Sequence, residues 1–241
     1  MRPTLLISDL HLAPELPGLE RAFVEFCRGP ARTAARLYVL GDLFDAWIGD
    51  EQLAEPLAER VAAALREVAA AGVPVEVMRG NRDLLLGERF ARTAGAALLP
   101  DEVVVDLAGT PTLLLHGDEL CTDDDAYQRY RAIVHDTGRQ RKFLALPFFL
   151  RRAAVAWLRR KSRSETATKT PVMMDVNAGA VAAALSRHGV RTMVHGHTHR
   201  PARHELAVDG AACVRWVLPD WRDRACWLEV DADGARLREG A

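Results

Sequence analysis

The chain has 241 residues, of which 49% are hydrophobic and 27% are charged, and its formal net charge is −1. These values exclude a disordered chain and fit one globular domain with an ample core and room for an inserted subdomain. The cysteines show no CxxC spacing and no disulfide-rich density, so they predict a reducing compartment, the cytosol; they are Cys27, Cys121, Cys213 and Cys226.

No segment of the sequence predicts export or a membrane span. Asp9 and His11 interrupt the apolar run near the N-terminus before it reaches the length of a signal-peptide core. The apolar segment 143–150 is far shorter than the roughly 20 residues needed to cross a bilayer, and it contains Pro147. We therefore expect a protein without transmembrane helices.

Short β-branched or leucine-rich runs alternate with longer alanine-rich amphipathic runs, a pattern typical of α/β proteins. In chain order, strands are predicted within residues 4–10, 36–44, 73–81, 111–118 and 191–199. Between them, helices are predicted around 51–71 and 173–188. Three consecutive strands follow within 203–209, 212–218 and 226–232, which is consistent with a mixed sheet or a sandwich.

Side chains that can bind a metal follow five of these predicted strands, at the point where each strand ends. They are Asp9, His11, Asp42, Asn81, His116, His197 and His199. Ligand sites in open α/β sheets gather outside the carboxyl ends of the strands, where the loops converge. Imidazole is the commonest protein ligand for a transition metal, and the stretch HGHTH holds three histidines in five positions. The sequence therefore predicts a metal site at this edge.

Taken alone, such residues have ordinary structural interpretations. A single aspartate after a strand, such as Asp45, is most often a turn residue or a helix cap. His135, His188 and His204 are single histidines, which are more often surface or structural residues than ligands, and we leave them unassigned. The prediction depends on the conjunction of D-x-H, G-D-x-x-D, G-N-x-D, H-G-D and G-H-x-H in one order.

This order of motifs resembles the calcineurin-like binuclear metallophosphoesterases, from Leu6 to about Arg200. The resemblance implies an α/β (α+β) fold, a β-sandwich flanked by helices, in a single domain over residues 1–241. It also implies two divalent metal ions, one bound by Asp9, His11 and His199, the other by Asn81, His116 and His197, with Asp42 as the bridge. Oxygen and nitrogen donors without thiolate suit Mn²⁺, Fe or Zn²⁺, and the abundant oxygen makes Mn²⁺ the expected ion.

Two ions at such a site lower the pKa of a bridging water and neutralise phosphoryl oxygens during in-line displacement. The predicted nucleophile is therefore derived from water and is not a side chain. The carbonyl of Asn81 is an uncharged ligand, so it limits the negative charge of the site. The expected catalytic residues are Asn81, Arg82 and His116.

One position departs from the pattern of many members of this family, in which a histidine follows the asparagine of the motif. Arg82 stands there instead. Arginine stays protonated and cannot give a proton to a leaving group, but its guanidinium can hold phosphate oxygens with two parallel hydrogen bonds. A phosphate leaving group is already stable as an anion, so Arg82 favours cleavage of a pyrophosphate. The alternative is an arginine that packs on a surface loop.

A basic and apolar stretch lies between Gln128 and Arg163. It carries eleven Lys or Arg residues and one acidic residue, Asp136, a local formal charge of +10. Interleaved Phe, Leu and Trp side chains suit an anionic membrane surface or a lipid, whereas no RGG or RRM-like signature supports nucleic acid. The structural alternative is a helical hairpin that buries its apolar face and solvates its arginines.

Nearly the whole chain is similar to one branch of this family, the UDP-2,3-diacylglucosamine pyrophosphatases of lipid A biosynthesis. The segments that carry the similarity are ISDLHL, GDLFDAWIGD, RGNRD, HGDELCTDD, FLALP, MDVN and HGHTHRPA. The similarity implies hydrolysis at the α-phosphate to UMP and 2,3-diacylglucosamine 1-phosphate (lipid X). It implies a helical insertion over about 122–170 that caps the acyl chains.

The same similarity implies substrate contacts by Asn81, Arg82, Asp124, Ser162, Thr166, Lys169 and His197. Thr166 departs from the asparagine that the family has at this position, so its contact is the least secure. His195 is expected either to support a ligand or to face the substrate.

The expected partners are a lipid-linked nucleotide and the anionic inner membrane, to which the protein binds peripherally from the cytoplasm. No nucleic acid and no obligate protein partner are expected. One alternative is a phosphodiesterase of the same fold that acts on another nucleotide or on nucleic acid. Another is a scaffold module without catalysis, but such a module has no reason to keep all seven ligands.

Overall fold

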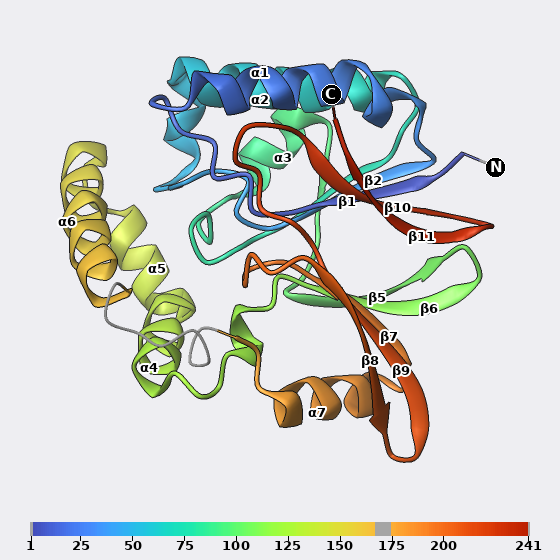
Figure 1. Ribbon diagram of the computed structural model, residues 1–241. Coiled ribbons are helices and arrows are strands. Elements are labelled where there is room, and N and C mark those ends of the chain that lie inside the picture. Colours follow the sequence, from blue (N-terminus) through green and yellow to red (C-terminus); the bar gives the residue numbers. More distant parts are fainter. Residues whose placement is uncertain (1, 167–174, 241) are drawn as a thin grey trace.

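The computed structural model describes residues 2–166 and 175–240, and of residues 159–166 it describes only the backbone. Two β-sheets lie face to face. Helices α1 (Pro17–Arg28) and α2 (Pro56–Ala70) cover the outer face of the first sheet, and α7 (Ala178–His188) covers the outer face of the second (Figure 1). This β-sandwich flanked by helices confirms the predicted fold class.

The first sheet has the strand order β11-β10-β1-β2-β3-β4. Its strands are β11 (Gly234–Glu239), β10 (Cys226–Asp231), β1 (Thr4–Ile7), β2 (Arg36–Leu40), β3 (Val75–Met78) and β4 (Ala97–Leu98). Neighbours among β1 to β4 are parallel, and β10 and β11 are antiparallel. Because both faces of a parallel sheet are covered, its strands are mostly apolar. Leu5 accordingly packs in the helix-side core, and Leu6 packs between the sheets. The charged residues Arg36 of β2 and Glu76 of β3 pair with each other.

The second sheet has the order β5-β6-β7-β9-β8. Its strands are β5 (Glu102–Leu107), β6 (Thr110–Leu115), β7 (Thr192–His195), β9 (Ala211–Val217) and β8 (Ala202–Val208). The pairs β6–β7 and β7–β9 are parallel. Helix α7 packs on this sheet. Asn177 caps its start, and the Asn177 side chain accepts a hydrogen bond from the Ala180 amide (3.0 Å). Gly189, with φ 63°, caps its end.

Local sequence features determine where several helices start. Both α1 and α2 start with proline in the first turn, where a missing N–H costs nothing. Helix α3 (Glu88–Ala94) starts where the Asp50 carboxylate accepts hydrogen bonds from the amides of Gly87, Arg89 and Phe90. The 3-10 helices are η1 (Pro30–Thr33), η2 (Asp50–Ala54) and η3 (Asp118–Leu120).

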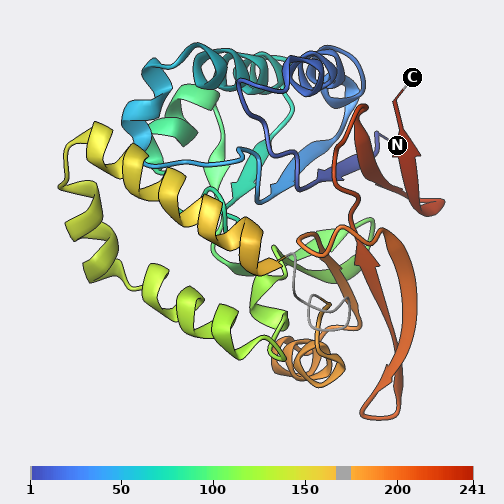
Figure 2. The ribbon, with the colours of Figure 1, turned by 60° about the vertical axis from the view of Figure 1, so that its left-hand side comes forward.

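Three helices, α4 (Asp125–Val134), α5 (Thr137–Leu144) and α6 (Phe148–Thr166), follow one another on one side of the sandwich (Figure 2). We refer to residues 125–166 as the insertion. Asp124 and Asp136 cap the starts of α4 and α5. Arg151 of α6 is only 2% exposed, donates to the Ile48 carbonyl at 2.6 Å and pairs with Glu51. No helix among the described residues has the length and apolarity needed to cross a bilayer.

All eight predicted strands and both predicted helices are present. Most have shorter bounds, whereas β8 and β9 start and end one residue earlier than predicted. The three strands expected after residue 200 do not form one meander: β8 and β9 pair in the second sheet, whereas β10 crosses over and pairs with β1. Helices α1 and α3 and strands β5 and β11 were not among the predicted elements.

Candidate metal centre

The strands β1, β2, β3, β6 and β7 end at one place between the two sheets, and the side chains predicted to bind metal meet there. In two groups of three side chains, the ligand atoms within each group lie within 4.8 Å of one another. One group is Asp9, His11 and His199, and the other is Asp9, Asp42 and His116. Asp9 and Asp42 are 0% and 1% exposed, so both carboxylates are buried. These residues therefore lie together at the carboxyl ends of the strands, where loops converge.

The first half of the cluster contains Asp9, His11 and His199. The Nε2 atoms of His11 and His199 lie 3.1 Å apart, and His199 Nε2 lies 3.2 Å from Asp9 Oδ1. His11 Nδ1 lies 3.7 Å from Asp42 Oδ2. Two imidazole nitrogens and a carboxylate oxygen therefore converge on one small volume.

The second half contains Asn81, His116 and His197. The Asn81 side-chain oxygen lies 3.0 Å from His116 Nε2 and 2.9 Å from His197 Nδ1. His116 Nε2 also lies 3.8 Å from Asp42 Oδ1. One oxygen of Asp42 thus faces each half of the cluster.

The backbone at these residues is held in an unusual conformation. Among the described residues, positive φ occurs at seven non-glycine positions, and five of them are predicted ligands, with φ between 50° and 67°: Asp9, His11, Asp42, His197 and His199. This region costs a residue with a side chain about 1 kcal/mol or more, and it persists where surrounding contacts enforce it. The concentration of strain at one cluster marks it as a functional site.

Glycines in the motifs allow the backbone to approach the ligands. A Cβ on Gly80 would collide with the carboxylate of Asp42, and a Cβ on Gly196 would collide with Ser8 and Asp9. The glycines of the G-N-x-D and G-H-x-H motifs are therefore needed for close contact between loops.

Burial and charge make the cluster suited to cations. Burial raises the pKa of Asp42 to about 7, with further increases from Asp83 and Asp9, although His116 opposes them. Burial disfavours the charged form of His116, yet the carboxylates of Asp42 and Asp9 raise its pKa to about 9. Asp9, Asp42 and Asp83 bury three carboxylates together, and the cationic groups near them include His116 and Arg82, whose guanidinium lies 3.6 Å from Asp42 Oδ2. Divalent ions would offset the negative charge that remains.

Two of the four histidines in the cluster, His11 and His197, are held neutral. Burial, together with Arg82, lowers the pKa of His11 to about 3. Burial and the charge of His116 lower the pKa of His197 to about 4. A neutral imidazole keeps a lone pair for a metal. Burial disfavours the charged form of His199, but its hydrogen bond with Asp9 raises its pKa, so His199 and His116 would release a proton when an ion binds. Nitrogen and oxygen donors without thiolate fit divalent transition ions.

Arg82 lies at the rim of the cluster. Its amide donates to Asp42 Oδ1 at 2.8 Å, and its guanidinium lies 3.6 Å from Asp42 Oδ2 and donates to Asp45 Oδ1 at 2.6 Å. The side chain is 37% exposed. The guanidinium therefore lies beside the ligand cluster. Asp45, interpreted from the sequence as a turn residue, also orients this guanidinium.

Asp83 is a buried residue that the sequence analysis did not assign. Its carboxylate accepts hydrogen bonds from four backbone amides, those of Gly80, Asp42, Leu43 and Phe44, at 2.8–3.3 Å. It therefore joins the loops after β2 and β3 and fixes Asp42 and Asn81 relative to each other. The sequence did contain a signal for this residue, because Asp83 is the last residue of the G-N-x-D motif.

His195 is buried, with 0% of its surface exposed. Its Nδ1 lies 2.8 Å from the Gly196 carbonyl, and its Nε2 lies 3.0 Å from the Arg215 guanidinium. Burial, together with Arg215, lowers the pKa of His195 to about 3. The ring supports the loop that carries His197. Of the unassigned histidines, His135 lies near Asp101 and His188 near Glu102.

The other residues predicted to contact substrate lie in or next to the insertion. Asp124 is 6% exposed, and its side chain accepts from the Tyr127 amide at 3.0 Å as the cap of α4. Ser162 and Thr166 lie in the part of α6 where only the backbone is described, and Lys169 lies outside the described residues.

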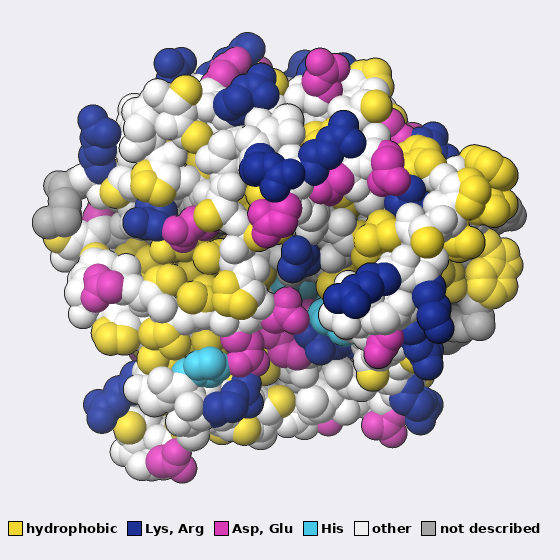
Figure 3. Space-filling model, turned by 180° about the vertical axis from the view of Figure 1, so that it is seen from behind, with side chains coloured by type: hydrophobic (Ala, Val, Ile, Leu, Met, Phe, Trp, Pro, Cys, Tyr) yellow, Lys and Arg dark blue, Asp and Glu magenta, His cyan; other side chains and the backbone are white. Residues whose placement is uncertain are grey.

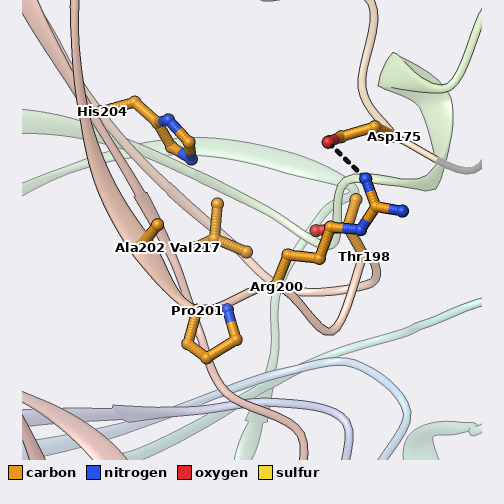
Figure 4. A pocket seen from close by; sticks show the side chains of 7 residues that line it. All are labelled: Asp175, Thr198, Arg200, Pro201, Ala202, His204 and Val217. Atoms are coloured by element: carbon orange, nitrogen blue, oxygen red, sulfur yellow. Dashed lines mark hydrogen bonds and ion pairs between the residues drawn. The ribbon is translucent and has the colours of Figure 1, made fainter. Parts of the chain in front are cut away.

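A surface depression of about 220 Å³ borders the loop of His197 and His199. Its lining combines apolar side chains with an ion pair, in which Arg200 donates to Asp175 at 2.8 Å (Figure 4); the residues are Asp175, Thr198, Arg200, Pro201, Ala202, His204 and Val217. The ligand loop thus separates the buried cluster from an open part of the surface.

Comparison with known proteins places the chain. A profile of the calcineurin-like phosphoesterase family matches residues 2–201. The UDP-2,3-diacylglucosamine hydrolases of Escherichia coli O81 (strain ED1a) and Shigella sonnei (strain Ss046) are each 47% identical over 234 residues, which is 97% of this chain and 97% of each relative. A solved archaeal phosphodiesterase aligns over 98% of this chain and 99% of its own, with 11% identity and a TM-score of 0.48. The family profile and the hydrolase relatives show that the chain belongs to the calcineurin-like phosphoesterase family of metal-dependent hydrolases.

Proposed function

We propose that the protein hydrolyses the pyrophosphate bond of UDP-2,3-diacylglucosamine at the α-phosphate, giving UMP and 2,3-diacylglucosamine 1-phosphate in lipid A biosynthesis. The observation that carries this proposal is 47% identity to hydrolases named for that substrate over 97% of both chains. The alignment covers 234 of the 241 residues, so it spans the insertion as well as the seven ligand positions. A general phosphodiesterase of this family has no need of a basic, apolar insertion.

The proposed cofactors are two divalent ions, in the first instance Mn²⁺. Asp9, His11 and His199 would hold one, Asn81, His116 and His197 the other, and Asp42 both. When bound, such ions activate water and neutralise phosphoryl oxygens. Asp83 would hold Asp42 in place through the backbone amides described above. The strained backbone of the ligands would keep the donors fixed, so that little reorganisation is needed during the reaction.

Arg82 is proposed to bind the diphosphate. Asp45 and Asp42 orient its guanidinium at the rim, and the side chain is accessible enough to reach a substrate oxygen. A planar, permanently charged group suits two phosphate oxygens at once. Because the leaving group is a phosphate, no proton donor is required at this position.

Arg82→Ala is therefore expected to lower kcat/KM about 10- to 100-fold, the value of one or two charge-assisted hydrogen bonds. Arg82→His is not expected to restore activity, because imidazole lacks the two-pronged geometry. Steady-state kinetics with UDP-2,3-diacylglucosamine measure both variants, with Arg66→Ala as a control in an exposed arginine. Unchanged kcat/KM in Arg82→Ala, or full activity in Arg82→His, would exclude this role.

The insertion is proposed to receive the acyl chains and to contact the anionic inner membrane. Figure 3 shows hydrophobic side chains beside Lys and Arg at the edge formed by these helices. Phe149 is 69% exposed and Trp157 is 63% exposed. Not every cation is available, because Arg131, Arg151 and Arg152 pair with acidic residues at the base of the insertion. The formal charge of +10 counted from the sequence is therefore larger than the charge that the insertion presents at its surface.

A peripheral, salt-sensitive membrane association follows from this surface. The protein is expected to sediment with anionic vesicles at low salt and to be released at about 1 M salt, where the Debye length is about 3 Å. Phe149→Ala is expected to lower the bound fraction about 10-fold, because one aromatic side chain loses its contact with the bilayer. Leu16→Ala, which alters an apolar side chain that is 45% exposed and lies outside the insertion, is the control. If Phe149→Ala and Leu16→Ala bound to the vesicles equally well, the membrane contact would not involve Phe149.

The proposed function is tested by a panel of substrates with Mn²⁺ added. UDP-2,3-diacylglucosamine, deacylated UDP-glucosamine, a water-soluble phosphodiester and single-stranded DNA are compared at equal concentration. A large preference for the acylated compound, with UMP released, is expected. Faster turnover of the phosphodiester or of DNA would support the alternative phosphodiesterase. A metal assay without a stoichiometric divalent ion would indicate a scaffold.

A further inference from the structure

Asp118 is a buried acid that belongs to neither half of the ligand cluster. It follows His116 by two residues, begins η3 and is 3% exposed. Its Oδ2 accepts a hydrogen bond from the Tyr127 hydroxyl at 3.0 Å and one from Arg131 Nε at 2.7 Å. Tyr127 and Arg131 stand four residues apart on α4, so both reach Asp118 from the same face of that helix.

This contact joins the insertion to the metal centre at the point where the insertion begins. The ring of Tyr127 lies 5.9 Å from the ring of His197. Tyr127 of α4 therefore contacts the ligand loop as well as Asp118. Gln128 adds to the junction, because its amide donates to the carbonyls of Asp118 (3.0 Å) and Cys121 (3.1 Å). The first turns of α4 are thus fixed to the loop that follows β6.

The chemistry of the junction favours a fixed geometry. Asp118 is nearly inaccessible and Arg131 is 20% exposed, so water weakens their attraction little. By contrast, the ion pair at the far end of α4, between His135 and Asp101 at 3.6 Å, involves a carboxylate that is 53% exposed. Exposed pairs of this kind contribute little to stability or geometry. Of these two contacts of α4 with the sandwich, only the one at Asp118 is buried.

We propose that Asp118 is a positioning residue that sets where the insertion stands relative to the metal centre, through Tyr127 and Arg131. When this carboxylate is lost, the Tyr127 hydroxyl and Arg131 lose the acceptor that holds the start of α4 to the loop after β6. The distance between α4 and His197 is then no longer fixed. The substrate class is that of the proposed function, on which the kinetic part of this inference depends. The ligands themselves would remain in place, because Asp83 and the strand ends hold them independently.

The test uses three variants of the full chain. Asp118→Ala removes both hydrogen bonds, Asp118→Asn keeps an acceptor for Tyr127 but loses the charge that pairs with Arg131, and Tyr127→Phe removes only the hydroxyl. Asp118→Ala is expected to lower kcat/KM for UDP-2,3-diacylglucosamine about 10- to 100-fold, and Asp118→Asn less. Bound Mn²⁺ per chain is expected to stay unchanged. Tyr127→Phe is expected to add nothing in the Asp118→Ala background, because its partner is already gone.

A second readout does not depend on the substrate. Trypsin cleavage of the folded protein at the arginines of α4 and α5 is expected to accelerate about 10-fold in Asp118→Ala and less in Asp118→Asn. Asp101→Asn, which removes the exposed carboxylate that faces His135 at the far end of α4, is the matched control and is expected to behave as the wild type in both assays. If Asp118→Ala fails to fold, Asp118→Asn alone carries the comparison.

The inference is overturned if trypsin cleavage of Asp118→Asn matches the wild type, if bound Mn²⁺ falls in parallel with activity, or if the effects of Asp118→Ala and Tyr127→Phe are additive. Failure of the proposed function is distinguishable. In that case the wild type itself does not turn over UDP-2,3-diacylglucosamine, while the proteolysis and Mn²⁺ measurements still decide the role of Asp118.

Discussion

Replacing Asp42 by asparagine is expected to remove tight binding of at least one divalent ion and to lower kcat/KM by about 1000-fold or more. One oxygen of this carboxylate faces each half of the cluster, so the substitution affects both ions. Loss of several kcal/mol of charge stabilisation in the transition state corresponds to this factor. Metal analysis of the purified variant and steady-state kinetics measure the two effects.

A stability measurement separates this effect from misfolding. Burial and the neighbouring Asp9 and Asp83 disfavour the charged form of Asp42, which is why its pKa is raised. The metal-free variant is therefore expected to unfold at the same temperature as the metal-free wild type or at a higher one, because one of three buried carboxylates is gone. Asp106→Asn, at an exposed position near the end of β5, is the control. A variant with full metal content and full turnover would contradict the bridging role.

Replacing Arg151 by alanine is expected to detach α6 from the sandwich and to destabilise the protein by about 2–4 kcal/mol. The guanidinium is 2% exposed, donates to the Ile48 carbonyl and pairs with Glu51. Glu51 is half-exposed, so the ion pair itself contributes little. Most of the loss arises because the Ile48 carbonyl loses its donor and the buried side chain leaves a cavity.

The neighbouring residue provides a matched control. Arg152 pairs with Glu55 but is 59% exposed, so Arg152→Ala is expected to cost less than about 1 kcal/mol. Urea unfolding followed by circular dichroism compares the two variants. Arg151→Lys is expected to recover only part of the stability, because an ammonium group lacks the planar fork that reaches both acceptors. Equal losses in Arg151→Ala and Arg152→Ala would show that burial of Arg151 does not anchor the helix.

The ligand positions were predictable because the signal is local. Each predicted ligand stands within four residues of the end of a buried strand, and parallel strands bring their carboxyl ends to one edge. The sequence pattern therefore identified Asp9, Asp42 and His116 as neighbours without any knowledge of the distances between them. The positive φ values of five ligands were not predictable, because they depend on contacts between loops that are far apart in the chain.

The residues that support the site were not predictable for the same reason. Arg151 was counted among the basic surface residues, but it is buried against a loop about 100 positions earlier. The pairing of Asp118 with Tyr127 and Arg131 requires knowledge of where α4 stands. Composition identified the insertion as basic and apolar, yet only the tertiary contacts show which of its cations join it to the sandwich.

The most direct measurement of the central claim is hydrolysis of UDP-2,3-diacylglucosamine in ¹⁸O-labelled water with Mn²⁺, followed by mass spectrometry of both products. The account predicts one ¹⁸O atom in UMP and none in the lipid 1-phosphate, because water attacks the α-phosphate. Label in the lipid product, or no release of UMP by protein that contains its divalent ions, would contradict the account.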